Sequence, residues 1–376
     1  MALSKISNDM FTTISRPDSK PLVVNGNMNI AQRGTSFTHA NSNNNEFPVD
    51  RFQFVVGSIG AFTSTQETLT SGAAYNAGFR EAARIDTTTA VASPDAGDYF
   101  WFQYIMEAQD CLVFKKGTSN AEKMTVAFWV KSNKTGTGQL TVKDSDNDRQ
   151  VAGTYTISSA DTWEHKVVNL PADTSGAMNN DNGAGFRFEW WLGAGSTYSG
   201  GAVPTAWEAR ADGDRGVSTL AINDNTANDW AITGVQVEVG EYSSTSLPPF
   251  QHECYDDNLL RCYRYYYRLT PTTGFRYAGW GQVDNDDEVI LGITWFKTHM
   301  RAAPSALEQS GTASHYKVRE ATTVTCDAVP TFTNADTWYA ATSFKKDGIT
   351  SSNGFAQGEP LKVGIDGGYL AWSAEL

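Results

Sequence analysis

The sequence predicts a mainly β protein: an antiparallel jelly-roll or sandwich domain, one linking helix and a smaller C-terminal β domain. Short apolar segments of strand length recur from Leu22 onward, separated by Gly, Asn, Asp, Ser and Thr. A helical pattern occurs convincingly once, after residue 255. A domain holds roughly 100–200 residues, so we expect the 376 residues to form two domains and a tail.

Composition and charge exclude several classes of protein. The 42 acidic and 29 basic residues give a net charge of −13, and there is no basic block to neutralise nucleic-acid phosphates. Aromatic residues make up 12% of the chain, too many for a disordered protein. No apolar run approaches the roughly 20 residues of a membrane span. We therefore expect neither nucleic-acid binding nor membrane insertion.

The cysteines and the N-terminus indicate that the chain is made and folded in a reducing cytoplasm, wherever it is finally located. The four cysteines include no CxxC pair, and the first residues lack an apolar signal stretch. Residues 1–21 mix Ser, Thr, Asp and Lys with isolated apolar residues and end at prolines. Such a segment forms no core by itself, and we expect an extended arm that is ordered by a partner.

Residues 22–240 are predicted to form the jelly roll. Along the segment 124–130, Phe128 faces one side with its i±2 neighbours, and Trp129 faces the other. The segment 186–192 alternates in the same way and turns Arg187, Glu189 and Trp191 away from the presumed core. Strands at this spacing, with turns between them, are typical of an antiparallel sandwich.

Residues 241–270 are predicted to hold a linker and a helix. Asp256 and Asp257 suit the helix N-terminus, and Thr270 with Pro271 is expected to end the helix. An apolar and aromatic stripe follows helical spacing at Leu259, Cys262, Tyr263, Tyr266 and Tyr267. Residues 271–376 return to β patterning and are predicted to form the second β domain.

Catalytic and metal-binding motifs are missing from the sequence. It contains no GxSxG elbow, P-loop or HExxH, and His252-Glu253 lacks the second metal histidine. The run from Asp144 to Asp148 resembles the start of an EF-hand loop, but Arg149 and Tyr155 replace its required Gly and Glu. A hairpin turn is the favoured interpretation. We expect no cofactor, metal or catalytic residue, although carboxylate pairs leave a hydrolase open.

Outward-facing aromatic residues suggest a sugar surface. Trp129 and Trp191 could stack on a sugar, and Arg187 and Glu189 could bind its hydroxyl groups. The alternative is that both faces of the sheet are buried, because Trp is highly buried on average. The C-terminal domain offers a second candidate, with Tyr277 and Trp280 near its start.

A series of ordered sequence blocks resembles a known family. Residues 25–36, NGNMNIAQRGTS, and the following VDRF at 49–52 are similar to the opening of domains in tail-fibre and receptor-binding proteins of tailed bacteriophages. Later blocks follow in the family's order, at 128–132, 161–164, 230–240, 249–252, 260–267, 300–304, 353–355 and 374–376. Phe52 replaces the usual Trp, and Tyr263 stands where the family often has Gln.

The resemblance implies a carbohydrate-binding-module-like jelly roll in a virion protein that is not an enzyme. It implies a short homotrimeric tail fibre, attached to other virion proteins through residues 1–21 and binding host surface polysaccharide. The helix stripe defined above would then lie at the trimer interface. Two alternatives remain: a head-decoration or tail-connecting protein without glycan binding, and a capsule-degrading tailspike enzyme.

Overall fold

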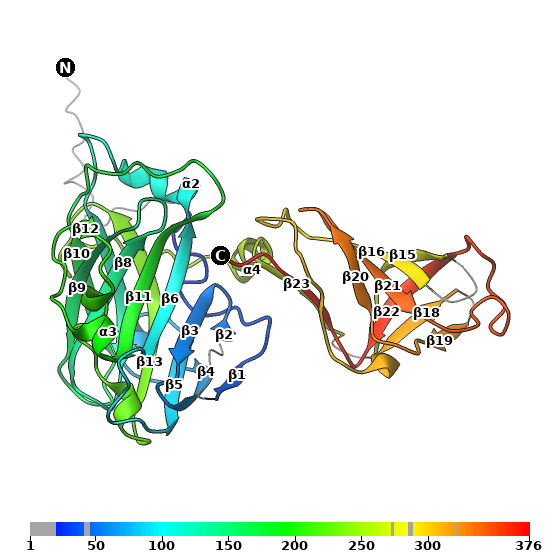
Figure 1. Cartoon of the computed structure of the whole chain (residues 1–376), viewed down its shortest axis with the longest axis horizontal. Coiled ribbons are helices and arrows are strands. Elements are labelled where there is room, and N and C mark those ends of the chain that lie inside the picture. Colours follow the sequence, from blue (N-terminus) through cyan, green and yellow to red (C-terminus); the bar gives the residue numbers. More distant parts are fainter. Residues whose placement is uncertain (1–19, 41–45, 272–273, 285–288, 321) are drawn as a thin grey trace, which may run out of the picture. The chain divides into compact units, whose positions relative to one another are not determined.

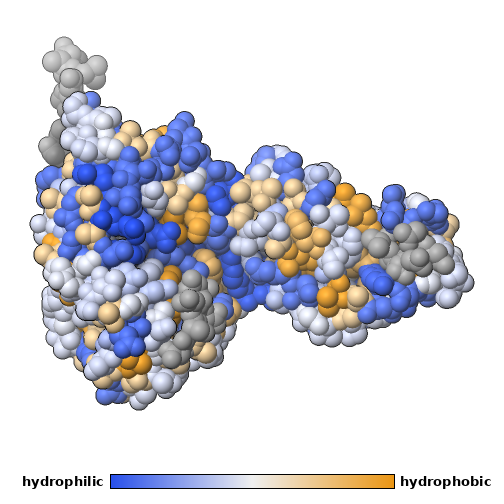
Figure 2. Space-filling model, viewed as in Figure 1, coloured by the Kyte–Doolittle hydropathy of each residue, from blue (hydrophilic) through white to orange (hydrophobic). Residues whose placement is uncertain are grey.

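The computed structural model describes residues 20–40, 46–271, 274–284, 289–320 and 322–376. The chain divides into two compact units, the first ending at Tyr255 and the second spanning Asp256–Glu375 (Figure 1). Most of the predicted arm, residues 1–21, lies outside the described residues. Each unit buries its own apolar residues, and hydrophobic residues also reach the surface of each between hydrophilic ones (Figure 2).

The first unit is a sandwich of two antiparallel sheets. The six-stranded sheet has the order β1, β4, β5, β13, β7, β10, with bounds Ser36–His39, Ala61–Thr68, Glu81–Thr89, Asp229–Val239, Met124–Lys131 and Glu164–Leu170. The seven-stranded sheet has the order β12, β9, β8, β11, β6, β3, β2, with bounds Glu208–Ala209, Arg149–Ile157, Gly136–Asp144, Ala184–Ala194, Tyr99–Glu107, Phe52–Gly57 and Glu46–Val49. Short helical segments in its loops are α1 Ala73–Asn76, α2 Ala108–Cys111, η2 Leu112–Phe114, α3 Ser196–Ser199, η3 Asp212–Asp214 and η4 Ile222–Asp224.

The core of this unit lies between the two sheets. Phe128 from one sheet meets Trp190 from the other at 5.6 Å between ring centroids, with the rings nearly perpendicular. Both side chains are fully buried, as the two-residue alternation of their strands predicts. The predicted antiparallel β-sandwich is thereby confirmed.

The second unit contains α4 (Tyr255–Tyr263), apart from its first residue, and two antiparallel sheets. A seven-stranded sheet has the order β19, β18, β22, β15, β16, β21, β20, with bounds Thr323–Thr325, Tyr316–Arg319, Pro360–Asp366, Phe275–Val283, Val289–Trp295, Tyr339–Lys345 and Thr331–Ala335. A three-stranded sheet has the order β14, β23, β17, with bounds Tyr266–Leu269, Leu370–Ser373 and Glu308–Gln309; a short helix, η5, spans Ala313–His315.

The helix ends seven residues earlier than the sequence pattern predicts. After Tyr263 the chain turns, and Tyr266 and Tyr267 enter β14, opposite Ser373 and Trp372. Aromatic residues favour strands as well as apolar helix faces, and pairing with β23 decides between the two. Extension of the helix to residue 270 was therefore wrong.

Candidate functional site

The four residues predicted to bind sugar do not form one surface. Trp129 lies on β7, on the outer face of the six-stranded sheet, whereas Arg187, Glu189 and Trp191 lie on β11 in the other sheet. The Trp129 ring packs 5.0 Å from the His165 ring and against a small apolar cluster. Trp129 and Trp191 therefore face opposite sides of the sandwich and cannot contact one sugar ring together.

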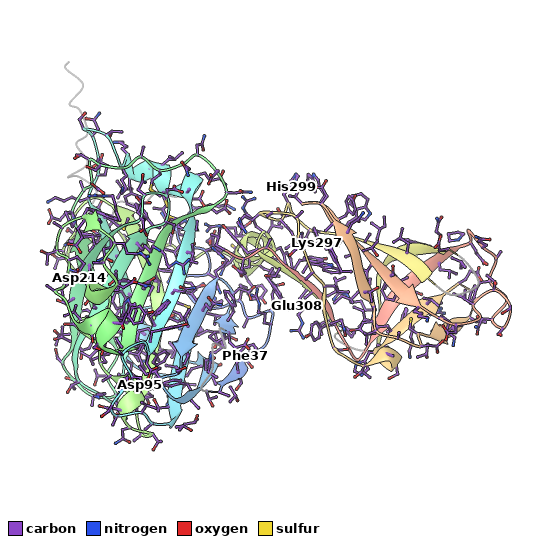
Figure 3. All side chains as sticks on the ribbon, in the orientation of Figure 1. Phe37, Asp95, Asp214, Lys297, His299 and Glu308 are labelled. Carbon is purple, nitrogen blue, oxygen red and sulfur yellow. The ribbon has the colours of Figure 1, made fainter. Side chains whose placement is uncertain are left out.

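The chain itself covers Trp191 and Glu189, which are both fully buried. The covering segment comprises residues 195–216, and Asp214 in Figure 3 lies within it. From this segment, Arg215 donates to both Glu189 carboxylate oxygens, at 2.8 and 3.0 Å. Its guanidinium also lies 5.1 Å from the Trp191 ring centroid. The alternative that this face is buried by a loop therefore holds for Trp191.

Strand residues anchor the covering segment through hydrogen bonds. The Gln139 amide donates to the carbonyl oxygens of Asp214 and Arg215 at 2.8 and 2.9 Å, and the Thr141 hydroxyl also donates to the latter at 2.7 Å. Burial lowers the pKa of Arg215, but the Glu189 and Asp212 carboxylates outweigh that effect and raise it. The segment is thus a fixed part of the fold, held by a fully charged arginine.

Most of the residues of the helix stripe, predicted as a trimer interface, are buried within the chain itself. Cys262, Tyr266 and Tyr267 are buried in the second unit, between 0% and 3% exposed. Leu259 and Tyr263 remain partly exposed. A partner chain could reach these last two residues, but not the three that are buried.

An exposed aromatic face occurs instead on the seven-stranded sheet of the second unit. It consists of Tyr277 and Trp280 from β15, Trp295 from β16 and Tyr339 from β21, and we call it the outer aromatic face. Trp280 and Trp295 are 61% and 67% exposed. Trp280 pairs with Ile293, so Trp295, two residues further along, projects from the same side.

Neighbouring side chains complete this face. Tyr339 lies opposite Trp295, with ring centroids 5.6 Å apart. The Lys362 ammonium lies 5.2 Å from the Tyr277 ring and 5.3 Å from the Trp280 ring. The register also places Gln282 and Ser343 on this side of the sheet, one row away. Aromatic rings and polar groups thus share one surface.

The opposite side of the same sheet packs on the core, which makes exposed aromatic residues on this side unusual. Leu361, Val363 and Ile365 alternate with Lys362 along β22 and are buried in the core. When one face of an antiparallel sheet packs on a core, the opposite face is ordinarily polar. Clustered exposed aromatic residues on that opposite face indicate a binding surface.

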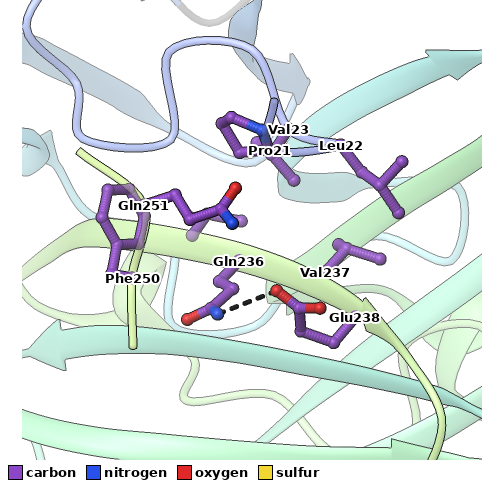
Figure 4. Close-up of a pocket in the computed structure, with 9 residues that line it drawn as sticks. Pro21, Leu22, Val23, Gln236, Val237, Glu238, Phe250 and Gln251 are labelled. Carbon is purple, nitrogen blue, oxygen red and sulfur yellow. Dashed lines mark hydrogen bonds between the residues drawn. The ribbon is translucent and has the colours of Figure 1, made fainter. Parts of the chain in front are cut away.

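Other kinds of site find little support. Within the part of the chain that the structure describes, no group of three or more His, Cys, Asp and Glu could hold a metal ion, and no helix is long and apolar enough to cross a membrane. The pocket in Figure 4 lies between Pro21 and β13 and has a volume of about 10 Å³. That volume admits about one water molecule, whereas an adjoining pocket that shares Pro21, Leu22 and Gln251 has a volume of about 310 Å³.

Comparisons with known proteins return only distant structural likeness. No family model matches the chain, and no curated protein matches it either. Among solved structures, the enzymatically active domain of tailspike protein 4 of bacteriophage CBA120 is 11% identical, with a TM-score of 0.28; the match covers 58% of this chain and 21% of that one.

Several carbohydrate-binding modules are also among the structural neighbours. The family 11 module of a Clostridium thermocellum cellulosomal cellulase is 5% identical with a TM-score of 0.27, covering 56% of this chain and 98% of that one. A tandem of two family 22 modules from Paenibacillus barcinonensis is 8% identical with a TM-score of 0.25, covering 95% of this chain and 98% of that one. At such TM-scores the likeness carries no functional argument.

The signal for the outer aromatic face was only partly present in the sequence. Tyr277 and Trp280 stand out there because they occur in one strand-like segment. Trp295 and Tyr339 join them only through the pairing of β16 with β15 and β21. Sequence reasoning missed these two residues because strand order and register are not encoded in any local pattern.

Proposed function

We propose that this protein is a structural component of a tailed-bacteriophage virion that binds host surface glycans through the outer aromatic face. The exposure of Trp280 and Trp295 on a rigid sheet is the observation that carries the proposal. The ordered sequence blocks that resemble tail-fibre proteins support the virion assignment. The binding role is non-catalytic.

The geometry of the face suits a sugar. A pyranose ring presents a flat array of C–H groups that packs against an aromatic ring, and its hydroxyl groups need polar partners. Trp280 and Trp295 supply the rings, while Lys362, Gln282 and Ser343 supply polar groups nearby. Strands hold these side chains more accurately than loops would.

A glycan array probed with the full-length chain tests this proposal. Trp280→Ala and Trp295→Ala should each weaken binding by about tenfold or more, the effect of removing a stacking ring worth roughly 1.5 kcal/mol. Trp338→Ala is the matched control, because Trp338 is 48% exposed but precedes β21 and packs against the His299 ring.

Two results would contradict the glycan assignment. The first is unchanged glycan binding by both tryptophan variants. The second is a drop in oligomer mass in those variants, with no glycan bound by the wild type; the face would then join copies of the chain. Mass measured by light scattering on the same samples separates these outcomes.

Trimer formation and attachment to the particle complete the proposal. In α4, Leu260 is 43% exposed and lies beside the partly exposed Leu259 and Tyr263, so these three residues are the helix surface available to a threefold contact. Replacing Leu260 with Asp should lower the solution mass to that of a monomer. Removing residues 1–21 should leave the mass unchanged and abolish incorporation into virions.

A further inference from the structure

Two positive charges lie directly opposite each other on the first unit. Arg187 on β11 pairs in register with Lys143 on β8, so both side chains project from the outer face of the seven-stranded sheet. Like charges directly opposite on neighbouring strands are destabilising. The pair is notable because the whole chain carries a net charge of −13.

Arg187 makes few of the contacts that a half-buried guanidinium needs. Its Nη1 donates to the Gln103 side-chain oxygen at 3.2 Å, whereas its Nε is buried without a hydrogen-bond acceptor. In the described residues no carboxylate lies within ion-pair distance of it. Burial lowers the pKa of Arg187, and the nearby Arg215 lowers it further against the attraction of Glu189.

Lys143 is only weakly neutralised. Its contact with Asp148 is long, at 3.7 Å, and the same carboxylate oxygen lies closer to Arg210, at 3.0 Å. Burial lowers the pKa of Lys143, and so do Arg210, Arg187 and Arg215, while Asp148 opposes them. Three arginines therefore act on Lys143, and one of them, Arg215, also acts on Arg187.

The carboxylates around this cluster are already engaged elsewhere. Glu189 is held by Arg215, and Asp212 contacts both Arg215 and Arg210. Asp148 is shared between Arg210 and Lys143. Among the described carboxylates of the cluster, none forms an ion pair with Arg187, and Glu189 attracts it only from a longer distance.

We propose that Arg187 and Lys143 form a subsite for an oxyanion, such as the carboxylate or sulfate group of an acidic polysaccharide. A guanidinium binds such groups through two parallel hydrogen bonds, and an ammonium adds a point charge. The bound anion would relieve the repulsion between the two cations. This subsite lies in the first unit and does not depend on the outer aromatic face of the second.

Calorimetric titration of the full-length chain tests the subsite at constant ionic strength. The probes are oligogalacturonate for carboxylate, dextran sulfate for sulfate, and neutral dextran. Wild type should bind at least one charged probe and not the neutral one. Arg187→Gln and Lys143→Gln should each weaken that binding about tenfold or more, as expected for loss of a charge-assisted hydrogen bond.

Lys115→Gln provides the matched control. It also removes one positive charge from the first unit, but Lys115 is 53% exposed and pairs with Glu122 away from this sheet. An equal loss of binding in Lys115→Gln would show non-specific attraction and overturn the subsite. Binding of neither charged probe, or equal binding by wild type and both subsite variants, would overturn it as well.

Thermal unfolding without any probe gives a second readout. Arg187→Gln and Lys143→Gln should match or exceed the wild-type Tm, because each removes one member of a repelling pair. A charged probe should then raise the Tm of wild type and Lys115→Gln more than that of either subsite variant. A clear fall in Tm in both subsite variants would indicate a structural role instead. Comparing oligogalacturonate with dextran sulfate shows whether the subsite binds carboxylate or sulfate groups.

Discussion

Arg215 fixes the covering segment of the first unit by donating to both carboxylate oxygens of Glu189 at 2.8 and 3.0 Å. Glu189 is fully buried, and the Arg215 side chain is only 10% exposed. Such a pair contributes little net stability when complete, but removing one partner leaves an uncompensated buried charge. The Glu189 carboxylate therefore adds a buried ionic anchor to the backbone contacts that Gln139 and Thr141 make with residues 195–216.

Glu189→Gln should destabilise the first unit by about 3–5 kcal/mol, because Arg215 would lose its buried counter-ion and keep only the longer contact with the more exposed Asp212. Urea unfolding followed by tryptophan fluorescence measures the change, since Trp191 and Trp101 report on this face. The double variant Glu189→Gln, Arg215→Met should recover part of the loss. A single variant as stable as wild type would show that the pair does not hold the segment.

Lys116→Met should be similarly destabilising, by about 3–5 kcal/mol. The Lys116 ammonium lies 2.7 Å from Asp144 and 3.0 Å from Asp173, and all three side chains are at most 5% exposed. Methionine fills similar volume but removes the cation between the two carboxylates, leaving Asp144 without its ion pair and Asp173 with Arg149 alone. Chemical unfolding beside the exposed-site control Lys123→Met checks this, and equal stability of the two variants would contradict it.

Acid should weaken the first unit through Asp173. Burial raises the pKa of this carboxyl, but hydrogen bonds from Arg149, Ser175 and Lys116 outweigh burial and lower it overall. Its contribution to stability is therefore fully present above the ordinary Asp pKa of about 3.9 and is lost as pH falls through the lower folded value. The Tm of wild type should fall with pH below about 4 more steeply than that of Asp173→Asn; parallel curves would contradict this.

Tyr267→Ala should unfold the second unit rather than merely separate subunits. The Tyr267 ring lies 5.4 Å from Phe296 and 6.3 Å from Trp372 within a common core. Truncating a buried aromatic side chain costs about 3–5 kcal/mol. Chemical unfolding together with solution mass measures both effects. A variant with normal stability and reduced mass would restore Tyr267 to a subunit interface.

Local patterns in the sequence predict the strands well but not how they meet. The alternation around Phe128 and Trp190 identifies core residues, because a strand's two faces follow from its period alone. The same alternation cannot say that Trp129 and Trp191 belong to different sheets, which depends on strand order. Nor can it reveal the opposition of Arg187 and Lys143, which depends on register.

Two features of the structure could not be predicted, because the sequence pattern was ambiguous for one and absent for the other. Tyr266 and Tyr267 satisfy both a helical stripe and a strand, and only pairing with β23 resolves the choice. Residues 195–216 contain no periodic pattern, so nothing in them predicts that Arg215 reaches Glu189 and buries Trp191. Contacts between segments far apart in sequence decide both cases.

The covering segment places its own cation, Arg215, over a group of aromatic rings of the first unit. Arg215 lies within 5.1 Å of the ring centroids of both Trp101 and Trp191, with Tyr198 at 5.7 Å, the arrangement in which aromatic cages hold a free cation. Trp101 and Trp191 lie on the strands beneath, β6 and β11, whereas Tyr198 belongs to the covering segment itself. A chain with a shorter segment at this position would expose the two tryptophan rings on an unchanged pair of strands.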